Sequence, residues 1–168
     1  MIGIESLSDS PGTVAALAGL LVEATALGAS VGFLHPLDPA KAAAFWRESL
    51  AQAAAGRRVL LGARDGGALV GTVTLVPAAY ENQPHRADVQ KLLVAGSHRR
   101  RGIARRLMAE AEARAARAGR TLLVLDTATA EAARLYEATG WKRTGEIPGF
   151  ALLPNGEPCA TAIYWKRV

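Results

Sequence analysis

The chain has 168 residues, of which 50% are hydrophobic and 21% are charged, and this composition excludes a disordered chain. Its length fits one domain of ordinary size, so we expect a single domain spanning residues 1–168. The net charge of +5 is compatible with a nucleic-acid-binding domain and equally with a site for a polyphosphate cofactor. The one cysteine, Cys159, excludes an internal disulfide and favours a reducing, cytoplasmic location.

Two helices are predicted in the N-terminal third. The first, Pro11–Ala29, follows Asp9 and Ser10, either of which can cap its first turn. This segment is nearly uncharged, but it is rich in small residues and has a glutamate in the middle, which disfavours a membrane-spanning helix. The second predicted helix is Pro39–Ala55, with Asp38 as its cap.

The remaining chain alternates strands and helices. The predicted elements are strands at Val59–Ala63, Ala68–Val76 and Val89–Val94, a helix from Gly102 to Gly119, a strand at Thr121–Leu125, a helix from Thr127 or Thr129 to Gly140, and strands at Trp141–Ile147 and Pro158–Lys166. The first two strands flank Asp65-Gly66-Gly67, a sequence typical of a tight hairpin turn. This order predicts an α/β domain with a mixed sheet, in which the helix after Gly102 joins two parallel strands.

The loop before that helix carries the main functional signal. Arg99–Arg101 precede Gly102, and Ala104 follows, so side-chain bulk is small where a helix begins. A helix N-terminus exposes unpaired N–H groups, which together with arginines favour phosphate. A Walker A loop would need Lys and then Ser or Thr after its glycine, whereas Ile103 stands here. The alternative is a solvated run of charges.

Two segments resemble the GNAT superfamily of N-acetyltransferases. Arg99-x-x-Gly102-x-Ala104 resembles its R/Q-x-x-G-x-G/A signature. Ala132-x-x-Leu135-Tyr136-x-x-x-Gly140-Trp141 resembles its A-x-x-L-Y-x-x-x-G-F block, with Trp141 in place of the usual Phe. A closer resemblance, to the tabtoxin-resistance acetyltransferases, rests on Arg86–Leu92, Leu125–Thr127, Gly145–Phe150 and Thr161–Tyr164.

The resemblance implies a mostly antiparallel, twisted sheet of about six to seven strands with about four helices and splayed central parallel strands. It implies acetyl-CoA as co-substrate and transfer of its acetyl group to a primary amine of an amino-acid-like or antibiotic-like small molecule, by direct attack in a ternary complex. The implied cofactor-binding residues are Leu92, Leu93, Val94, Arg99, Arg100, Arg101, Gly102, Ile103, Ala104 and Thr129. Thr129 stands where the family often has Asn, and Thr can still cap the helix and make one hydrogen bond.

The reaction needs a neutral amine, whereas only about one alkylamine in 2,500 is neutral at pH 7. Asp88 is the candidate base, since it lies eleven residues before Arg99, where histone-acetylating members place a strand glutamate. The alternative is a structural carboxylate that pairs with Arg86 or Lys91. Tyr136 is implied as the acid that protonates the leaving thiolate, with simple packing as its alternative. The N–H of Leu93 or Val94 is implied as the oxyanion donor.

Five further residues are candidates for the acceptor side, with core packing or a surface loop as the alternative. They are Phe33, Trp46, Tyr80, Glu81 and His85. The histidine and cysteine spacing predicts no metal site. The rival functions are a basic nucleic-acid-binding domain and an acetyl-CoA-binding regulatory module without turnover. We expect no specific nucleic-acid partner and no membrane, while a homodimer stays open.

Overall fold

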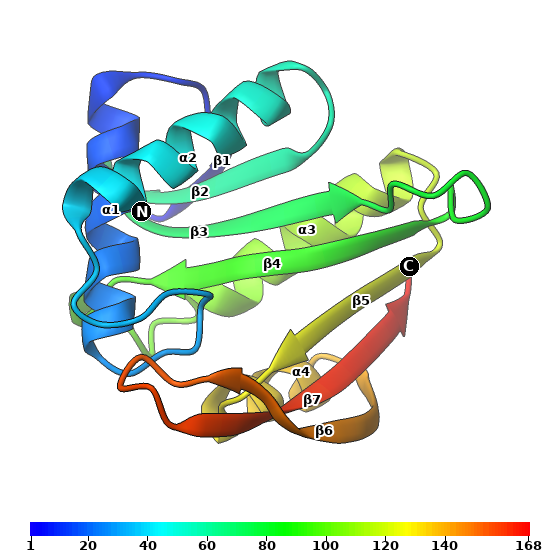
Figure 1. Ribbon diagram of the computed structural model, residues 1–168. Coiled ribbons are helices and arrows are strands. Elements are labelled where there is room, and N and C mark those ends of the chain that lie inside the picture. The colour runs from blue at the N-terminus through cyan, green and yellow to red at the C-terminus, as the bar shows by residue number, and fades with distance from the viewer.

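The computed structural model describes residues 1–168 and contains one seven-stranded sheet with helices on both faces (Figure 1). Its elements are β1 (Gly3–Ser6), α1 (Pro11–Ala26), α2 (Pro39–Ala54), β2 (Val59–Asp65), β3 (Ala68–Pro77), β4 (Arg86–Val94), the 3₁₀ turn η1 (Gly96–His98), α3 (Ile103–Arg117), β5 (Leu122–Thr127), α4 (Ala130–Ala138), β6 (Lys142–Leu152) and β7 (Pro158–Arg167). The strand order is β1-β2-β3-β4-β5-β7-β6, and only β4 and β5 are parallel neighbours. This confirms the expected α/β fold.

Local capping places the helices close to where the sequence predicts them. Ser10 Oγ accepts the Thr13 N–H of α1 at 3.1 Å, and Asp38 Oδ1 accepts the Ala40 N–H of α2 at 2.8 Å. The first helix ends at Ala26, three residues before the predicted end, because the chain turns left-handed at Gly28. None of the helices combines the length and apolar content that crossing a membrane requires.

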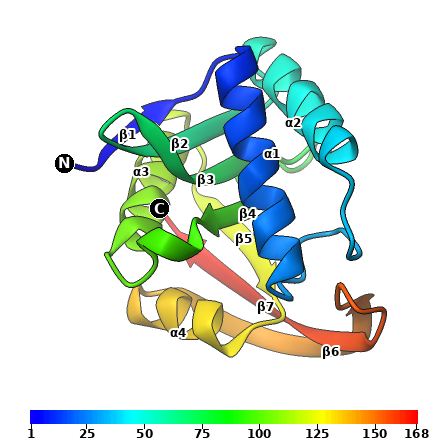
Figure 2. The same ribbon diagram turned by 90° about the vertical axis from the view of Figure 1, so that its left-hand side faces the viewer.

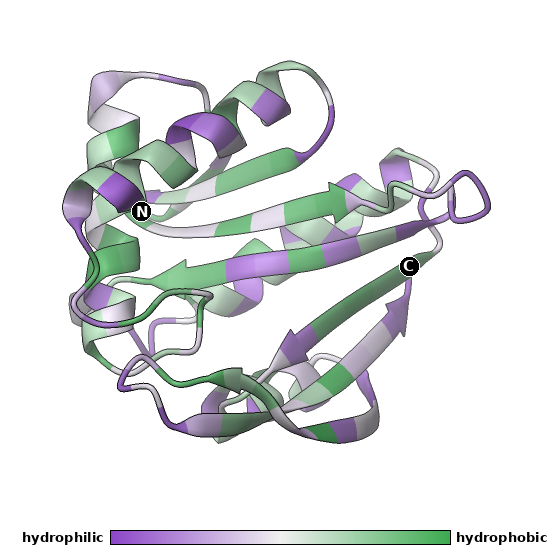
Figure 3. Cartoon of the chain, in the orientation of Figure 1, coloured by the Kyte–Doolittle hydropathy of each residue, from purple (hydrophilic) through white to green (hydrophobic).

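The sheet separates two apolar clusters. Helices α1 and α2 cover one face and α3 and α4 the other (Figure 2). Trp46 and Leu93 belong to the cluster beneath α1 and α2, whereas Leu107, Tyr136 and Trp141 belong to the one beneath α3 and α4. The central strands are mainly apolar, but hydrophilic residues interrupt β4 (Figure 3).

Strand β1, the start of β4 and the end of β6, which lies at Leu152 instead of the predicted Ile147, differ most from the prediction. Strand β1 was not predicted, because four residues of an edge strand that are mostly exposed carry no alternation. Strand β4 begins at Arg86, before the predicted Val89, because pairing with β3 and β5 keeps its polar first residues extended.

The parallel pair β4–β5 separates along its length, as the family resemblance implied. It is paired only from Arg86 opposite Leu122 to Asp88 opposite Val124. Beyond Asp88 the two strands diverge without a shared ladder (Figure 1). A bulge lies in the same stretch of β4, where the register on β3 shifts between Thr72 and Thr74. Bulges bend a strand and disrupt its pairing, so the bulge accounts for the open edge.

Candidate active site

The open edge of β4 presents backbone groups without a sheet partner. Ala95 N–H donates to Val70 O of β3 at 2.9 Å. Successive residues of a strand direct their backbone groups to opposite sides, so the N–H and C=O of Val94 face the gap between β4 and β5. The side chain of Leu93 is buried beneath α1 and α2. Of the two predicted oxyanion donors, Val94 therefore has the suitable direction.

The N-terminus of α3 is open for an anion. The first backbone N–H of this helix that has an acceptor belongs to Arg106 and donates to Gly102 O at 3.1 Å. The N–H groups of Ile103, Ala104 and Arg105 have no acceptor. Gly102 is left-handed, with φ of 76°, and a Cβ there would meet nothing within 4 Å. The Ile103 side chain is buried and anchors the helix. Free N–H groups at a helix start form a natural phosphate site.

The three arginines of the preceding loop do not act alike. Arg101 donates to Asp65 Oδ2 at 3.1 Å, which turns its guanidinium toward the β2–β3 hairpin. Arg99 and Arg100 are exposed, and their side chains make no ion pair within the protein. Glu23 of α1 fixes the loop from the other side, since its carboxylate accepts the Gly96 N–H at 3.1 Å. Two of the three guanidinium groups thus remain available for an anion.

Asp88 lies at the last paired position of β4 and β5. Arg86 Nη1 donates to its carboxylate at 3.0 Å, so the predicted structural pairing exists. Burial nevertheless raises the pKa of Asp88, the Arg86 charge opposes this, and the nearby Asp126 charge raises the pKa further. Asp126 itself accepts the Thr161 hydroxyl at 2.8 Å. A carboxyl of raised pKa is a stronger base once it is ionised.

Tyr136 is buried, and its hydroxyl makes no hydrogen bond within the protein. Its ring lies between those of Trp141 and Tyr164, at 5.9 Å from each centroid. Burial raises the pKa of Tyr136, and the charge of Asp126 raises it further. The phenol is therefore protonated at neutral pH and has a proton to donate.

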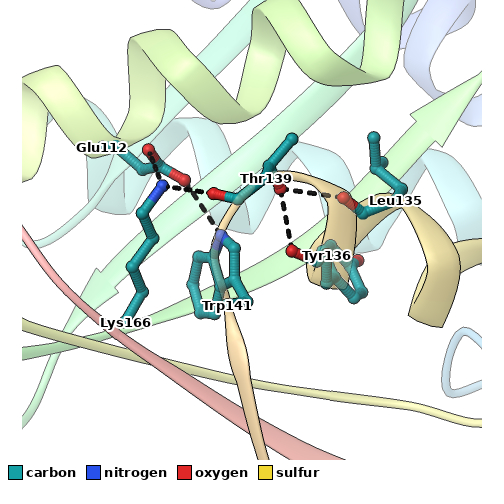
Figure 4. Close-up of polar contacts among 6 residues, drawn as sticks. All are labelled: Glu112, Leu135, Tyr136, Thr139, Trp141 and Lys166. Atoms are coloured by element: carbon teal, nitrogen blue, oxygen red, sulfur yellow. Dashed lines mark hydrogen bonds and ion pairs between the residues drawn. The ribbon is translucent and has the colours of Figure 1, made fainter.

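A polar cluster holds the end of α4, and with it Tyr136, against α3 and β7 (Figure 4). Glu112 of α3 accepts the Trp141 indole N–H at 2.9 Å and the Lys166 ammonium at 2.7 Å. Lys166 also donates to Thr139 O at 2.7 Å. Trp141 thus makes a hydrogen bond that the family's usual Phe cannot make.

The chain matches a known protein family. A model of the acetyltransferase (GNAT) family matches residues 28–141, which is more than half of the chain. The chain belongs to the GNAT family. Membership confirms acetyl-CoA as the expected co-substrate of the chain.

Solved structures share this GNAT fold. The ribosomal-protein-alanine N-acetyltransferase of Brucella melitensis is 20% identical with a TM-score of 0.81, over 99% of each chain. The Salmonella typhimurium protein yncA, assigned as an acetyltransferase and solved with its cofactor acetyl-CoA, is 16% identical with a TM-score of 0.79, over 98% of this chain and 94% of that one. An N-acetyltransferase of Staphylococcus aureus Mu50 is 14% identical with a TM-score of 0.80, over 98% of both chains.

Four of the residues predicted for the acceptor side are either buried or precede the paired part of β4. Trp46 is 0% exposed and packs in the core, so it has no surface for an acceptor. Tyr80, Glu81 and His85 lie between β3 and β4, before the start of β4, whereas the strands diverge beyond Asp88. An extended chain advances about 3.3 Å per residue, so Tyr80, Glu81 and His85 lie on the opposite side of Asp88 from the open edge of β4.

Phe33 and Thr129 keep positions that are compatible with the site. Phe33 lies in the loop between α1 and α2, half-buried, with its ring edge-on to Phe45 at 5.4 Å. Thr129 caps α4 by accepting the Ala132 N–H at 3.3 Å, so this acceptor position is occupied. A second contact from Thr129 is limited to its hydroxyl proton.

Two residues that the sequence analysis did not assign lie beside this site. The charge of Asp126 raises the pKa of Asp88, of Lys91 and of Tyr136, and Asp126 lies on β5 two residues beyond its last pairing with β4. The position of Asp126 near the carboxyl end of a parallel strand was an available signal, because ligand sites gather there. Lys91 carried no comparable signal, since its direction depends on the bulge.

Proposed function

We propose that this GNAT protein is an N-acetyltransferase that moves the acetyl group of acetyl-CoA to a primary amine of a small molecule, by direct attack in a ternary complex. One observation carries the proposal. The partnerless N–H groups of Ile103 and Ala104 open beside the unpaired edge of β4, with Asp88 and Tyr136 where β4 and β5 part. The acetyl donor supplies an activated thioester.

In this proposal, backbone groups make most of the contacts with acetyl-CoA. The N–H groups from Arg100 to Ala104 hold the diphosphate, helped by the guanidinium groups of Arg99 and Arg100, while the Arg99 N–H donates to Gly96 O. The β4 edge from Leu92 to Val94 pairs with the pantetheine amides in the way that a neighbouring strand would. A position without a Cβ at Gly102 keeps the approach open.

The chemical step assigns one role to each of three groups. Asp88 accepts the ammonium proton, directly or through water, and the freed amine nitrogen forms its bond to the acetyl carbon. The Val94 N–H donates to the carbonyl oxygen as negative charge develops on it. As the carbon–sulfur bond breaks, Tyr136 gives its proton to the thiolate. The second proton leaves the nitrogen as the amide forms and returns to the Tyr136 oxygen, so the products are the acetylated amine, a free thiol and the proton held by Asp88.

The acceptor in this proposal is a small molecule that carries an amine. The resemblance to tabtoxin-resistance enzymes favours an amino-acid-like or antibiotic-like acceptor. Asp88 and Asp126 place negative charge at the site, which favours a cationic amine. The other candidate functions have less support, because Arg101 is committed to Asp65 and Tyr136 keeps a free hydroxyl.

Thermal unfolding with acetyl-CoA tests the donor site. A ligand at 100 times its Kd stabilises by about 2.7 kcal/mol, which is roughly 5–10 °C in Tm for a chain of this size. Gly102→Glu should abolish the shift, because a side chain and a negative charge enter the anion site. Gly119→Glu is the matched control, since Gly119 is also left-handed and open but lies at the other end of α3. Equal shifts in both variants would refute the assignment.

Release of free thiol measured with a panel of primary amines tests turnover. We expect thiol to appear only when an amine acceptor is present, at a rate that follows amine concentration. Binding of acetyl-CoA without thiol release from any amine would favour the regulatory module instead.

A further inference from the structure

An ammonium group that makes no hydrogen bond and no ion pair lies beside the site. Lys91 stands in the β4 bulge with φ of 53°, a left-handed conformation that is unusual for a residue with a side chain. Its Nζ lies 5.5 Å from the ring centroid of Phe45 on α2. It makes no hydrogen bond and no ion pair with any group of the protein. The bulge therefore directs a charged side chain toward an aromatic ring, where no anionic or hydrogen-bonding group of the protein receives it.

The loop between α1 and α2 passes close to this ammonium. A Cβ built at Gly32, in the loop between α1 and α2, would lie 3.5 Å from Lys91 Nζ. Gly32 has φ of 89°, which also disfavours any other residue there. Lys91 Nζ has no hydrogen-bond partner, and it is not among the fully enclosed polar atoms that lack one, which are Trp46 Nε1, Arg58 Nε, Thr74 Oγ1 and Arg120 Nε. Lys91 Nζ therefore keeps contact with solvent.

The same loop forms a wall at the open end of the splayed strands. His35 N–H donates to Pro154 O in the β6–β7 turn at 2.9 Å, which joins the two segments. They lie side by side in both ribbon views (Figures 1 and 2). Lys91 thus lies between this wall and the gap that the donor occupies in the proposed function.

The charge of Lys91 is not balanced by the protein. Burial lowers the pKa of Lys91, and the charge of Asp126 raises it. Asp126 is bonded to the Thr161 hydroxyl and makes no ion pair with Lys91. A cation that is partly removed from water without an anion costs free energy, and a ligand that brings an anion recovers it.

We propose that Lys91 binds a carboxylate of the acceptor, so that the acceptor is an amino acid or a close relative rather than a plain amine. This rests on the proposed transferase function and adds the acceptor class to it. Asp88 and Lys91 are three residues apart on β4, which is at most about 10 Å of chain, and the bulge between Asp88 and Leu93 changes the face to which Lys91 points. That spacing suits an amine and a carboxylate separated by several bonds, with the amine toward Asp88.

Paired acceptors test the proposal. γ-Aminobutyrate, β-alanine and L-lysine are each offered beside the corresponding carboxamide, and kcat/KM is measured by thiol release. The wild-type protein should prefer at least one acid over its amide by 10-fold or more. Lys91→Met should bring that ratio close to one, and Lys91→Arg should restore most of it. Lys41→Met is the matched control, because Lys41 lies 5.9 Å from the Phe33 ring in the same aromatic group but is exposed.

The possible outcomes separate this proposal from the transferase itself. Acetylation without a preference for the acid, or a preference that survives in Lys91→Met, overturns the role of Lys91 and leaves the transferase function standing. A rise in the KM for acetyl-CoA that is equal for both acceptors in Lys91→Met also overturns it, because the ammonium would then serve the donor. Transfer to none of the acids and none of the amides overturns both proposals.

Discussion

Replacing Tyr136 by Phe removes one oxygen atom that has no partner in the protein. The ring stays between Trp141 and Tyr164, and the side chain is only 6% exposed, so the packing is retained. No hydrogen bond within the protein is lost. We therefore expect the free energy of unfolding to change by less than about 0.5 kcal/mol, or roughly 1–2 °C in Tm.

The expected effect on turnover is much larger. At ordinary values, a phenol of pKa about 10 that protonates a thiolate of pKa about 8.5 works against roughly 2 kcal/mol. Burial raises the pKa of Tyr136, which increases this cost and keeps the hydroxyl protonated at every physiological pH. General acids contribute about 10²–10⁴ in rate, and a weak acid belongs to the lower end. We expect a loss of about 10²–10³ in rate.

The assay is the single-turnover rate of acetyl transfer at saturating acceptor, together with the Kd for acetyl-CoA from thermal shifts. Tyr164→Phe is the control, because its ring lies 5.9 Å from that of Tyr136 but its hydroxyl donates to Glu137 at 2.8 Å. The control should lose about 1 kcal/mol of stability and little rate. Full single-turnover activity in Tyr136→Phe would refute the acid role. A parallel loss of acetyl-CoA affinity would instead assign the hydroxyl to binding.

Two further predictions concern the supports of the site. Glu112→Ala leaves Trp141 Nε1 and Lys166 without their shared carboxylate, so it should cost about 2–3 kcal/mol and lower Tm by roughly 5–10 °C, measured by thermal unfolding. A Tm within 2 °C of the parent value would contradict the role given to this cluster. The acidic limb of the kcat/KM profile should lie above the ordinary aspartate pKa of about 3.9, because burial raises the pKa of Asp88 and the base must lose its proton before it can act. Arg86→Met should move this acidic limb to higher pH, since the Arg86 charge lowers the pKa of Asp88. Asp88→Asn should remove the limb. An acidic limb that neither variant changes would belong to another group.

The sequence by itself determined the elements whose causes are local. Ser10, Asp38 and Thr129 cap helices through N–H groups two or three residues further along the chain. Gly102 opens α3 because the left-handed turn there needs no side chain. The spacing of two motifs also led to the family, which the comparison confirmed. Each of these signals lies within a few residues of the structure it predicts.

Only the tertiary structure decided how the site is assembled. The bulge that turns Lys91 toward Phe45 exists because β4 pairs with β3, and Asp126 reaches the site because β5 lies beside β4 for a short distance. Trp46 proved to be core, a result of how α2 packs. Strand register, bulges and burial depend on contacts between residues that are distant in sequence. The free energy of these contacts is divided among many residues, so no short stretch of sequence carries a pattern that predicts them.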